Sequence, residues 1–208
     1  MAYHGTGRDG WTPGSPLYPV SIGEYLAVGW RVLAADLLGW ILLTIIYIAV
    51  LLVASSTAIG TFLVIGPLEV GWYAVILKRL REGVFDIGEL GKGFSRFVPA
   101  FLASAVISVF SALGFIFLII PGLLVLAAYL FVFPLISDLD SDFWTVMETS
   151  RKVVAPRLIE WTFFVVVQAL LIVLGAMACG LGILLVLPWI KIATAVAYEE
   201  VFAAVREQ

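Results

Sequence analysis

The 208-residue sequence contains very few of the side chains that enzymes most often use for catalysis or metal binding. It has one cysteine, Cys179, and one histidine, His4. A lone cysteine excludes an intramolecular disulfide framework and a thiolate metal cluster. His4 lies in an N-terminal segment rich in glycine, proline and aromatic residues, where we expect a solvated side chain and not a ligand. Chemistry that depends on histidine or cysteine therefore has little support.

Catalytic motifs are missing as well. The sequence has no P-loop, no G-x-S-x-G nucleophile elbow, no H-E-x-x-H zinc motif and no dinucleotide-binding fingerprint. Asp138, Asp140 and Asp142 form an acidic cluster, but it lacks the glycine and the final glutamate of an EF-hand loop. We expect these carboxylates to cap a helix and to remain solvated. The sequence thus predicts a protein that is not an enzyme and that holds no metal and no cofactor.

Charged residues are scarce, and this scarcity indicates the class of protein. Only 13% of the residues are charged, 62% are hydrophobic, and the mean hydropathy is +1.11. Soluble domains carry about 25% charged residues. The net charge of −3 and the lack of a basic stripe argue against nucleic-acid binding. We therefore expect the chain to lie in a membrane, with lipids as its partners and a protein partner left open.

Six apolar segments have the length of roughly 20 residues that a helix needs to cross a bilayer. They lie at 37–57, 60–77, 97–113, 115–137, 158–177 and 183–203. The predicted fold class is an all-α integral membrane protein with six transmembrane helices. Residues 1–20 contain no apolar core, so we expect a flexible tail that precedes a single domain at 21–205.

After the N-terminal tail, all basic residues except Lys191 lie in or next to one set of connections, which predicts the orientation of the chain. They are Arg31, Lys78, Arg79, Arg81, Lys92, Arg96, Arg151, Lys152, Arg157 and Arg206. The turns near 55–60, 111–114 and 176–182 carry no charge. We therefore expect a multi-pass protein of the cytoplasmic membrane with both termini in the cytoplasm. Cys179 should then lie near the outer surface.

Three segments resemble one another and indicate an internal repeat. They are SIGEYLAVGWRVLAAD at 21–36, DIGELGKGFSRFVPAF at 86–101 and DFWTVMETSRKVVAPR at 142–157. The first two begin with capping-box patterns, Ser21 with Glu24 and Asp86 with Glu89. We expect each segment to form an amphipathic helix in the membrane interface, followed by a hairpin of two spanning helices. The three repeats would cover about 21–81, 86–138 and 142–205.

A basic residue holds the same place in each repeat, namely Arg31, Arg96 and Lys152. In a threefold arrangement these side chains would form a ring at the depth of the lipid headgroups. One hypothesis is that the ring binds the phosphates of anionic lipids, with each cation contributing on the order of 1 kcal/mol. The alternative is that the three residues only set the orientation and extend toward the membrane surface.

A resemblance to a known group rests on four stretches of the sequence. They are IGEYLAVGWRVL, IIPGLLVLAAYLFVFPLI, FWTVMETSRKVV and LPWIKIATAVAYEE. Over about residues 20–205 the chain resembles prokaryotic six-helix membrane proteins related to the membrane domain of glycerophosphoryl diester phosphodiesterases. The resemblance implies a membrane domain without its own catalytic centre. The soluble catalytic barrel of the phosphodiesterases, with its metal-binding carboxylates, has no counterpart in this chain.

Two opposite charges lie inside the apolar segments. Glu69 follows Gly60 by nine residues, and Lys191 follows Gly182 by nine, so the two charges hold equivalent positions in the first and third repeats. An unpaired charge at the bilayer centre costs roughly 2.5–3.5 kcal/mol. We therefore expect Glu69 and Lys191 to form an ion pair, directly or through one water.

The depth of this pair depends on two prolines. If Pro67 and Pro188 lie inside continuous helices, the pair is near the middle of the membrane. If each proline opens its helix, the pair is nearer the outer surface.

Two functions remain open at this point. The first is a non-enzymatic scaffold or accessory protein that engages lipid headgroups or a partner at its cytoplasmic face. The second is a small transporter with a site between the repeats around Glu69 and Lys191, and with Gln168 as a further residue of a polar path. Because no second carboxylate or histidine continues a relay from the pair, the sequence favours a structural ion pair and the first function.

Overall fold

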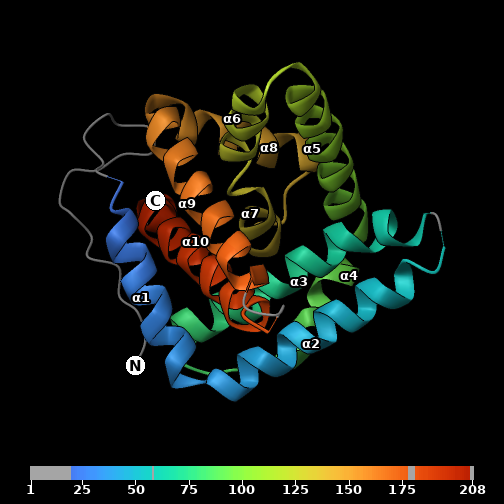
Figure 1. Cartoon of the computed structure of the whole chain (residues 1–208), viewed down its shortest axis with the longest axis vertical. Helices are drawn as coiled ribbons and strands as arrows, with labels where there is room; N and C mark the ends of the chain where they lie inside the picture. Colours follow the sequence, from blue (N-terminus) through green and yellow to red (C-terminus); the bar gives the residue numbers. More distant parts are fainter. Residues whose placement is uncertain (1–19, 58, 178–180, 207–208) are drawn as a thin grey trace.

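The computed structural model describes residues 20–57, 59–177 and 181–206, with side chains as far as Phe202 (Figure 1). Every regular element in these ranges is a helix. The prediction of an all-helical protein is therefore confirmed for the part of the chain that the structure describes. Cys179 lies outside the described residues.

The long helices coincide with the apolar segments of the sequence. They are α2 (Leu37–Ala54), α3 (Gly60–Glu82), α5 (Phe97–Phe117), α6 (Ile119–Ala128) with α7 (Val132–Asp138), α9 (Leu158–Met177) and α10 (Ile183–Arg206). The shorter elements are α1 (Ile22–Ala35), the 3₁₀ helix η1 (Ile87–Gly91), α4 (Lys92–Ser95), α8 (Phe143–Val154) and the 3₁₀ helix η2 (Ala155–Arg157). Each of these helices lies where the sequence has a long run of mostly apolar residues, so hydropathy alone predicts the positions of the helices.

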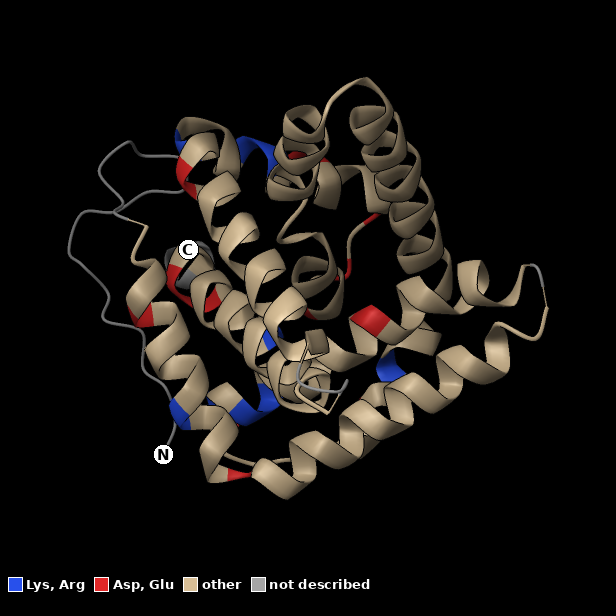
Figure 2. Cartoon of the chain, in the orientation of Figure 1, with Lys and Arg blue, Asp and Glu red and all other residues tan. Residues whose placement is uncertain are grey.

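Within the described residues, five stretches are long and apolar enough to cross a membrane. They are Leu37–Ala54, Gly60–Glu82, Phe97–Phe117, Ile119–Asp138 and Phe143–Met177. Helix α10, which contains Lys191, Glu199 and Glu200, is not among them. Figure 2 shows the same distribution, with α2, α5 and α6 free of charged residues. Length and composition thus indicate a multi-pass membrane protein.

Three helical hairpins follow one another around the molecule. They are α2–α3, α5–α6 and α9–α10, and each contacts the next, because α3 packs on α5, α6 on α9 and α10 on α2. In Figure 1 α3 begins at one edge of the molecule and α6 begins at another. The two helices of each hairpin also contact one another, α5 and α6 most extensively.

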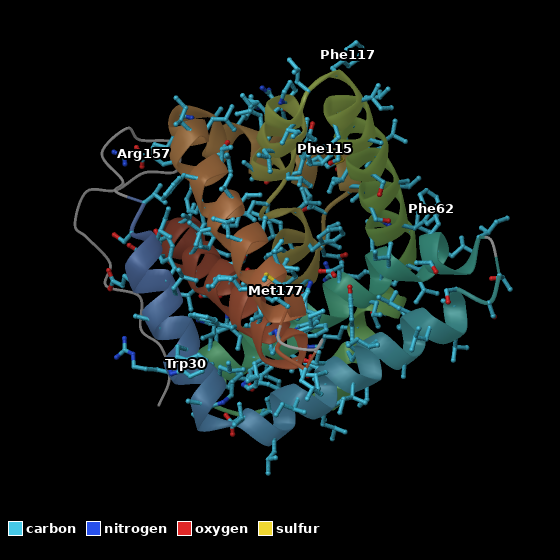
Figure 3. All side chains as sticks on the ribbon, viewed as in Figure 1. Trp30, Phe62, Phe115, Phe117, Arg157 and Met177 are labelled. Carbon is cyan, nitrogen blue, oxygen red and sulfur yellow. The ribbon has the colours of Figure 1, made fainter. Side chains whose placement is uncertain are left out.

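Helices α3 and α10 form the centre of the core. Helix α10 is buried without a break from Ile192 to Phe202, and α3 is buried from Gly66 to Leu77 apart from Glu69, which is only slightly exposed. Apolar side chains are exposed elsewhere, among them Phe62 near the start of α3, Phe117 at the end of α5 and Met177 at the end of α9, all labelled in Figure 3. Phe117 and Met177 are each 76% exposed. An apolar exterior of this extent suits contact with lipid and not with water.

Pro67 and Pro188 lie inside continuous helices. Glu69 is therefore the tenth of the 23 residues of α3, about 13 Å along the helix at 1.5 Å per residue. The alternative in which each proline opens its helix is wrong.

The segment between α3 and α5 differs from the expected amphipathic helix. It forms η1 and the single turn α4, and both lie directly against α3. A Cβ atom on Gly93 would come 1.8 Å from the carbonyl oxygen of Pro67, and one on Gly71 would come 2.2 Å from that of Leu90. The two glycines allow a close approach of backbone to backbone, which the repeat alignment did not indicate.

Candidate functional site

Glu69 and Lys191 form an ion pair between α3 and α10. The Lys191 ammonium contacts Oε2 of Glu69, and the hydroxyl of Tyr47 in α2 donates a hydrogen bond of 2.6 Å to Oε1. The side chains of Lys191 and Glu69 are only 12% and 14% exposed. The structure thus brings together the two charges that the sequence singled out, and Tyr47 adds a third helix to the pair.

Aromatic rings surround the Lys191 ammonium. Its Nζ lies 5.6 Å from the ring centre of Tyr47, 5.2 Å from that of Trp72 and 5.5 Å from that of Tyr73. A desolvated cation–π contact is worth about 2 kcal/mol or more. The sequence analysis missed these rings, although Trp72 and Tyr73 follow Glu69 by three and four residues and so share its helix face.

Gln168, the residue of the proposed polar path, lies in α9 and contacts α10. Its side-chain amide donates a hydrogen bond of 2.9 Å to Oγ1 of Thr194, which in turn donates to the carbonyl oxygen of Ile190. Thr194 follows Lys191 by three residues and therefore lies on the same face of α10. Gln168 is thus connected to the ion pair through Thr194 of α10, and its amide is held by a side chain of the protein.

A second ionic cluster joins three helices, and we call it the Arg81 junction. It consists of Arg81 in α3, Asp138 at the end of α7, and Tyr198 and Glu199 in α10. The Arg81 guanidinium donates to both carboxylate oxygens of Asp138, at 2.6 and 2.9 Å, and to Glu199 at 2.8 Å. The Tyr198 hydroxyl donates to Asp138 at 2.7 Å. Bidentate arginine–carboxylate contacts of this kind have a strict geometry and fix the relative positions of the helices that carry them.

The Arg81 junction corrects the expectation for the acidic cluster. Asp138 was expected to be a solvated cap, but its side chain is only 10% exposed and pairs with Arg81. Asp142 does cap α8, because it accepts hydrogen bonds from the backbone N–H and the hydroxyl of Thr145. Asp140 is exposed. No metal-binding cluster of these residue types occurs in the described part of the chain. Arg81 and Asp138 are 57 residues apart, so no local signal could have revealed their contact.

A cavity of about 450 Å³ lies beside the Arg81 junction, between α3, α4 and the end of α7. Its lining includes four cationic side chains, two carboxylates and two hydroxyls. They are Lys78, Arg81, Lys92, Arg96, Glu82, Asp138, Ser95 and Ser137. Ala74 and Leu77 of α3 form an apolar wall.

Two carboxylates that are not part of the cavity lining hold its two lysines. Lys78 donates to Asp86 at 2.7 Å and to Glu89 at 2.8 Å, and Lys92 pairs with the other oxygen of Glu89. The hydrogen bond from Lys78 lowers the pKa of Asp86. Burial alone would raise the pKa of Glu89, but the hydrogen bonds from Lys78 and Lys92 outweigh it, so this pKa is lowered as well. Both carboxylates therefore stay ionised at neutral pH.

The predicted ring of Arg31, Arg96 and Lys152 has three different environments. Arg31 is exposed on α1, and Lys152 is exposed on α8, where it lies 3.5 Å from Glu148. Arg96 is half-buried, lines the cavity and donates to the backbone carbonyls of Ile136 and Leu139 at the end of α7. Among the contacts of the described residues, none joins these three cations.

Comparisons of the chain with protein-family models, with curated proteins and with solved structures found no match. The function must therefore be argued from the residues of the chain itself.

Proposed function

We propose that the chain is a non-enzymatic integral membrane protein, a scaffold or accessory protein that engages anionic lipid headgroups at its cytoplasmic face. One observation carries this proposal. Each of the three mutually similar segments exposes both an aromatic ring and a cation: Trp30 and Arg31, Phe94 and Lys92, and Trp144 and Lys152. Figure 3 shows Trp30 on the outside of α1. Aromatic rings and cations together are typical of segments at the membrane–water interface.

The membrane arrangement that we propose has six spans in three hairpin repeats. The packing of α3 on α5, α6 on α9 and α10 on α2 supports it, because each hairpin meets the next in the same way. Helix α10 would be the sixth span, with the charge of Lys191 compensated by Glu69. In this arrangement both termini are cytoplasmic, and a membrane-impermeant thiol reagent should label Cys179 from outside intact cells. Labelling only after the inner face is exposed would overturn the orientation.

The lipid proposal is tested by the retention of lipid on the purified full-length chain. Reconstituted into mixed bilayers and extracted again, the protein should retain anionic phospholipid in preference to phosphatidylcholine. The double variant Arg31→Gln/Lys152→Gln should lower this preference several-fold, since each cation contributes on the order of 1 kcal/mol. The matched control is Glu24→Gln/Glu148→Gln, which removes two charges of the opposite sign from the same two helices and should not lower it. Equal retention of both lipids by the unaltered protein would exclude the proposal.

A transporter is the second candidate, and one observation favours it. Gln168 and Thr194 lie beside Lys191 and Glu69, so polar side chains of α2, α3, α9 and α10 meet inside the apolar core. A transport site requires a solute that binds there. Stoichiometric binding of a small solute that is lost in Gln168→Leu would support this candidate, and the absence of any such solute from the protein purified from native membrane would reject it.

A further inference from the structure

We propose that the cavity between α3, α4 and α7 binds a phosphate group, either of a phospholipid headgroup or of a small soluble phosphate compound. The lipid case rests on the proposed function. The cationic lining is the first support: Lys78, Arg81, Lys92 and Arg96 line the cavity together with two carboxylates, Glu82 and Asp138. Lys78, Lys92 and Arg81 also pair with carboxylates outside the lining, so Arg96 is the cation of the lining that has no hydrogen-bonded carboxylate. The carboxylates that hold the two lysines, Asp86 and Glu89, are not part of the lining.

Arg96 is the second support, because its guanidinium is held in place and yet has no close carboxylate partner. Its Nη1 donates to the carbonyl oxygens of Ile136 and Leu139. The nearest carboxylate is that of the exposed Asp140, 4.0 Å from Nη2 and beyond hydrogen-bonding distance. A guanidinium has five N–H donors in a planar fork that matches a phosphate. The backbone of α7 thus positions a fork whose remaining donors are available to a ligand.

Ser137 is the third support. Its hydroxyl oxygen is buried, has no hydrogen-bond partner among the described residues, and belongs to the lining of the cavity. A buried hydroxyl without a partner is unfavourable, and such groups are normally satisfied by protein, water or ligand. A rotation of the Ser137 side chain would bring this hydroxyl to the surface of the cavity, where a phosphate oxygen would accept its hydrogen bond.

Together these groups favour a phosphate over other anions. The planar fork of Arg96, the exposed ammonium of Lys92 and the hydroxyl of Ser137 provide donors from several directions, as a tetrahedral phosphate with three or four oxygens requires. The volume of about 450 Å³ lies within the range of small-molecule sites, roughly 300–1,000 Å³. It suffices for a phosphate with a glycerol-sized group, which the apolar wall of Ala74 and Leu77 would contact.

The test uses the full chain, three variants and two kinds of ligand. Lys92→Gln removes an exposed cation of the lining, and Ser137→Ala removes the unpartnered hydroxyl with little change in volume. Arg96→Gln removes the guanidinium fork. Because it also removes the hydrogen bonds to the end of α7, its binding result is used only if the variant melts at the same temperature as the unaltered chain. Arg151→Gln, an exposed cation outside the cavity, is the control. The ligands are phosphatidylglycerol in phosphatidylcholine nanodiscs, and inorganic phosphate or glycerol 3-phosphate added to protein in phosphatidylcholine nanodiscs.

We expect Lys92→Gln and Ser137→Ala each to weaken binding by roughly tenfold, and Arg151→Gln to leave it unchanged. If the two variants lose phosphatidylglycerol binding, the ligand of the cavity is a lipid headgroup. If they lose binding of inorganic phosphate or glycerol 3-phosphate, the ligand is a soluble phosphate compound. If Lys92→Gln and Ser137→Ala bind both ligands as tightly as the unaltered chain, the cavity site is overturned. The proposed function then still stands if Arg31→Gln/Lys152→Gln lowers anionic-lipid retention, and it fails separately if that variant has no effect.

Discussion

Glu69 and Lys191 join α3 and α10, the two most buried helices of the protein. A second ion pair between the same two helices has the positions of the positive and negative charges exchanged. Helix α3 supplies the carboxylate in this pair, whereas it supplies the cation in the contact of Arg81 with Glu199 of α10. Arg81 lies 12 residues after Glu69, and Glu199 lies 8 residues after Lys191, so the two pairs occur in the same order along α3 and α10. Two pairs of opposite polarity cannot both form if one helix slides or rotates relative to the other. The pairs therefore fix the register of the core.

The ion pair predicts strong energetic coupling between its two residues. Glu69→Gln leaves the Lys191 ammonium without a carboxylate, and Lys191→Met leaves the Glu69 carboxylate without a cation, so each should destabilise the protein by roughly 3 kcal/mol. The double variant should be more stable than either single variant, because no isolated charge remains. Thermal unfolding of the four proteins in detergent measures the cycle.

Tyr47→Phe is the control for this cycle, since it removes one hydrogen bond to Glu69 and leaves both charges in place. It should cost about 1–2 kcal/mol. Additive losses in the two single variants would show that Glu69 and Lys191 do not stabilise one another.

The Arg81 junction predicts that one guanidinium holds three helices together. Arg81→Gln leaves Asp138 and Glu199 mostly buried without their cation, so we expect a loss on the order of 2–3 kcal/mol. Arg151→Gln breaks a pair with Glu148 that is largely exposed, and it should cost at most about 1 kcal/mol. Equal melting temperatures of the two variants would show that the junction does not stabilise the fold.

The sequence was sufficient to predict the long helices and the partnership of Glu69 with Lys191. Both follow from the scarcity of charge, since hydropathy marks the helices and an isolated carboxylate in apolar sequence requires a cation. The Arg81 junction could not be predicted, because Arg81 is one of several cations in the last turns of α3 and just after it, and the sequence makes each of them an equally good partner for Asp138. The contact of η1 and α4 with α3 was also missed. Gly71 and Gly93 allow this contact because they have no side chain, and the absence of a side chain gives no hydropathy or charge signal in the sequence.

The close contact at Gly93 predicts a sharp difference between two neighbouring glycines. A Cβ atom on Gly93 would lie 1.8 Å from the carbonyl oxygen of Pro67, whereas one on Gly91 would have no atom within 4 Å. Gly93→Ala must push α4 away from α3 and should destabilise the protein by roughly 2 kcal/mol or more. Gly91→Ala should be neutral. Similar melting temperatures for the two variants would contradict the packing of α4 on α3.

The helix caps predict a further matched pair. Asp142 accepts two hydrogen bonds from Thr145 at the start of α8, so Asp142→Ala should cost about 1 kcal/mol. Ser21 precedes α1 but its side chain makes no capping hydrogen bond, so Ser21→Ala should cost almost nothing, in contrast to the capping box that its sequence pattern indicates. Melting temperatures of the two variants measure the difference, and a larger loss for Ser21→Ala would reverse the assignment of caps.

The lipid composition of the full chain purified from its native membrane tests the proposed function most directly. Mass spectrometry of the bound lipids should show anionic phospholipids enriched over their fraction in the surrounding membrane, and this enrichment should fall in Arg31→Gln/Lys152→Gln. A bound lipid composition equal to that of the membrane, together with one small solute bound per chain, would contradict the lipid proposal and favour transport.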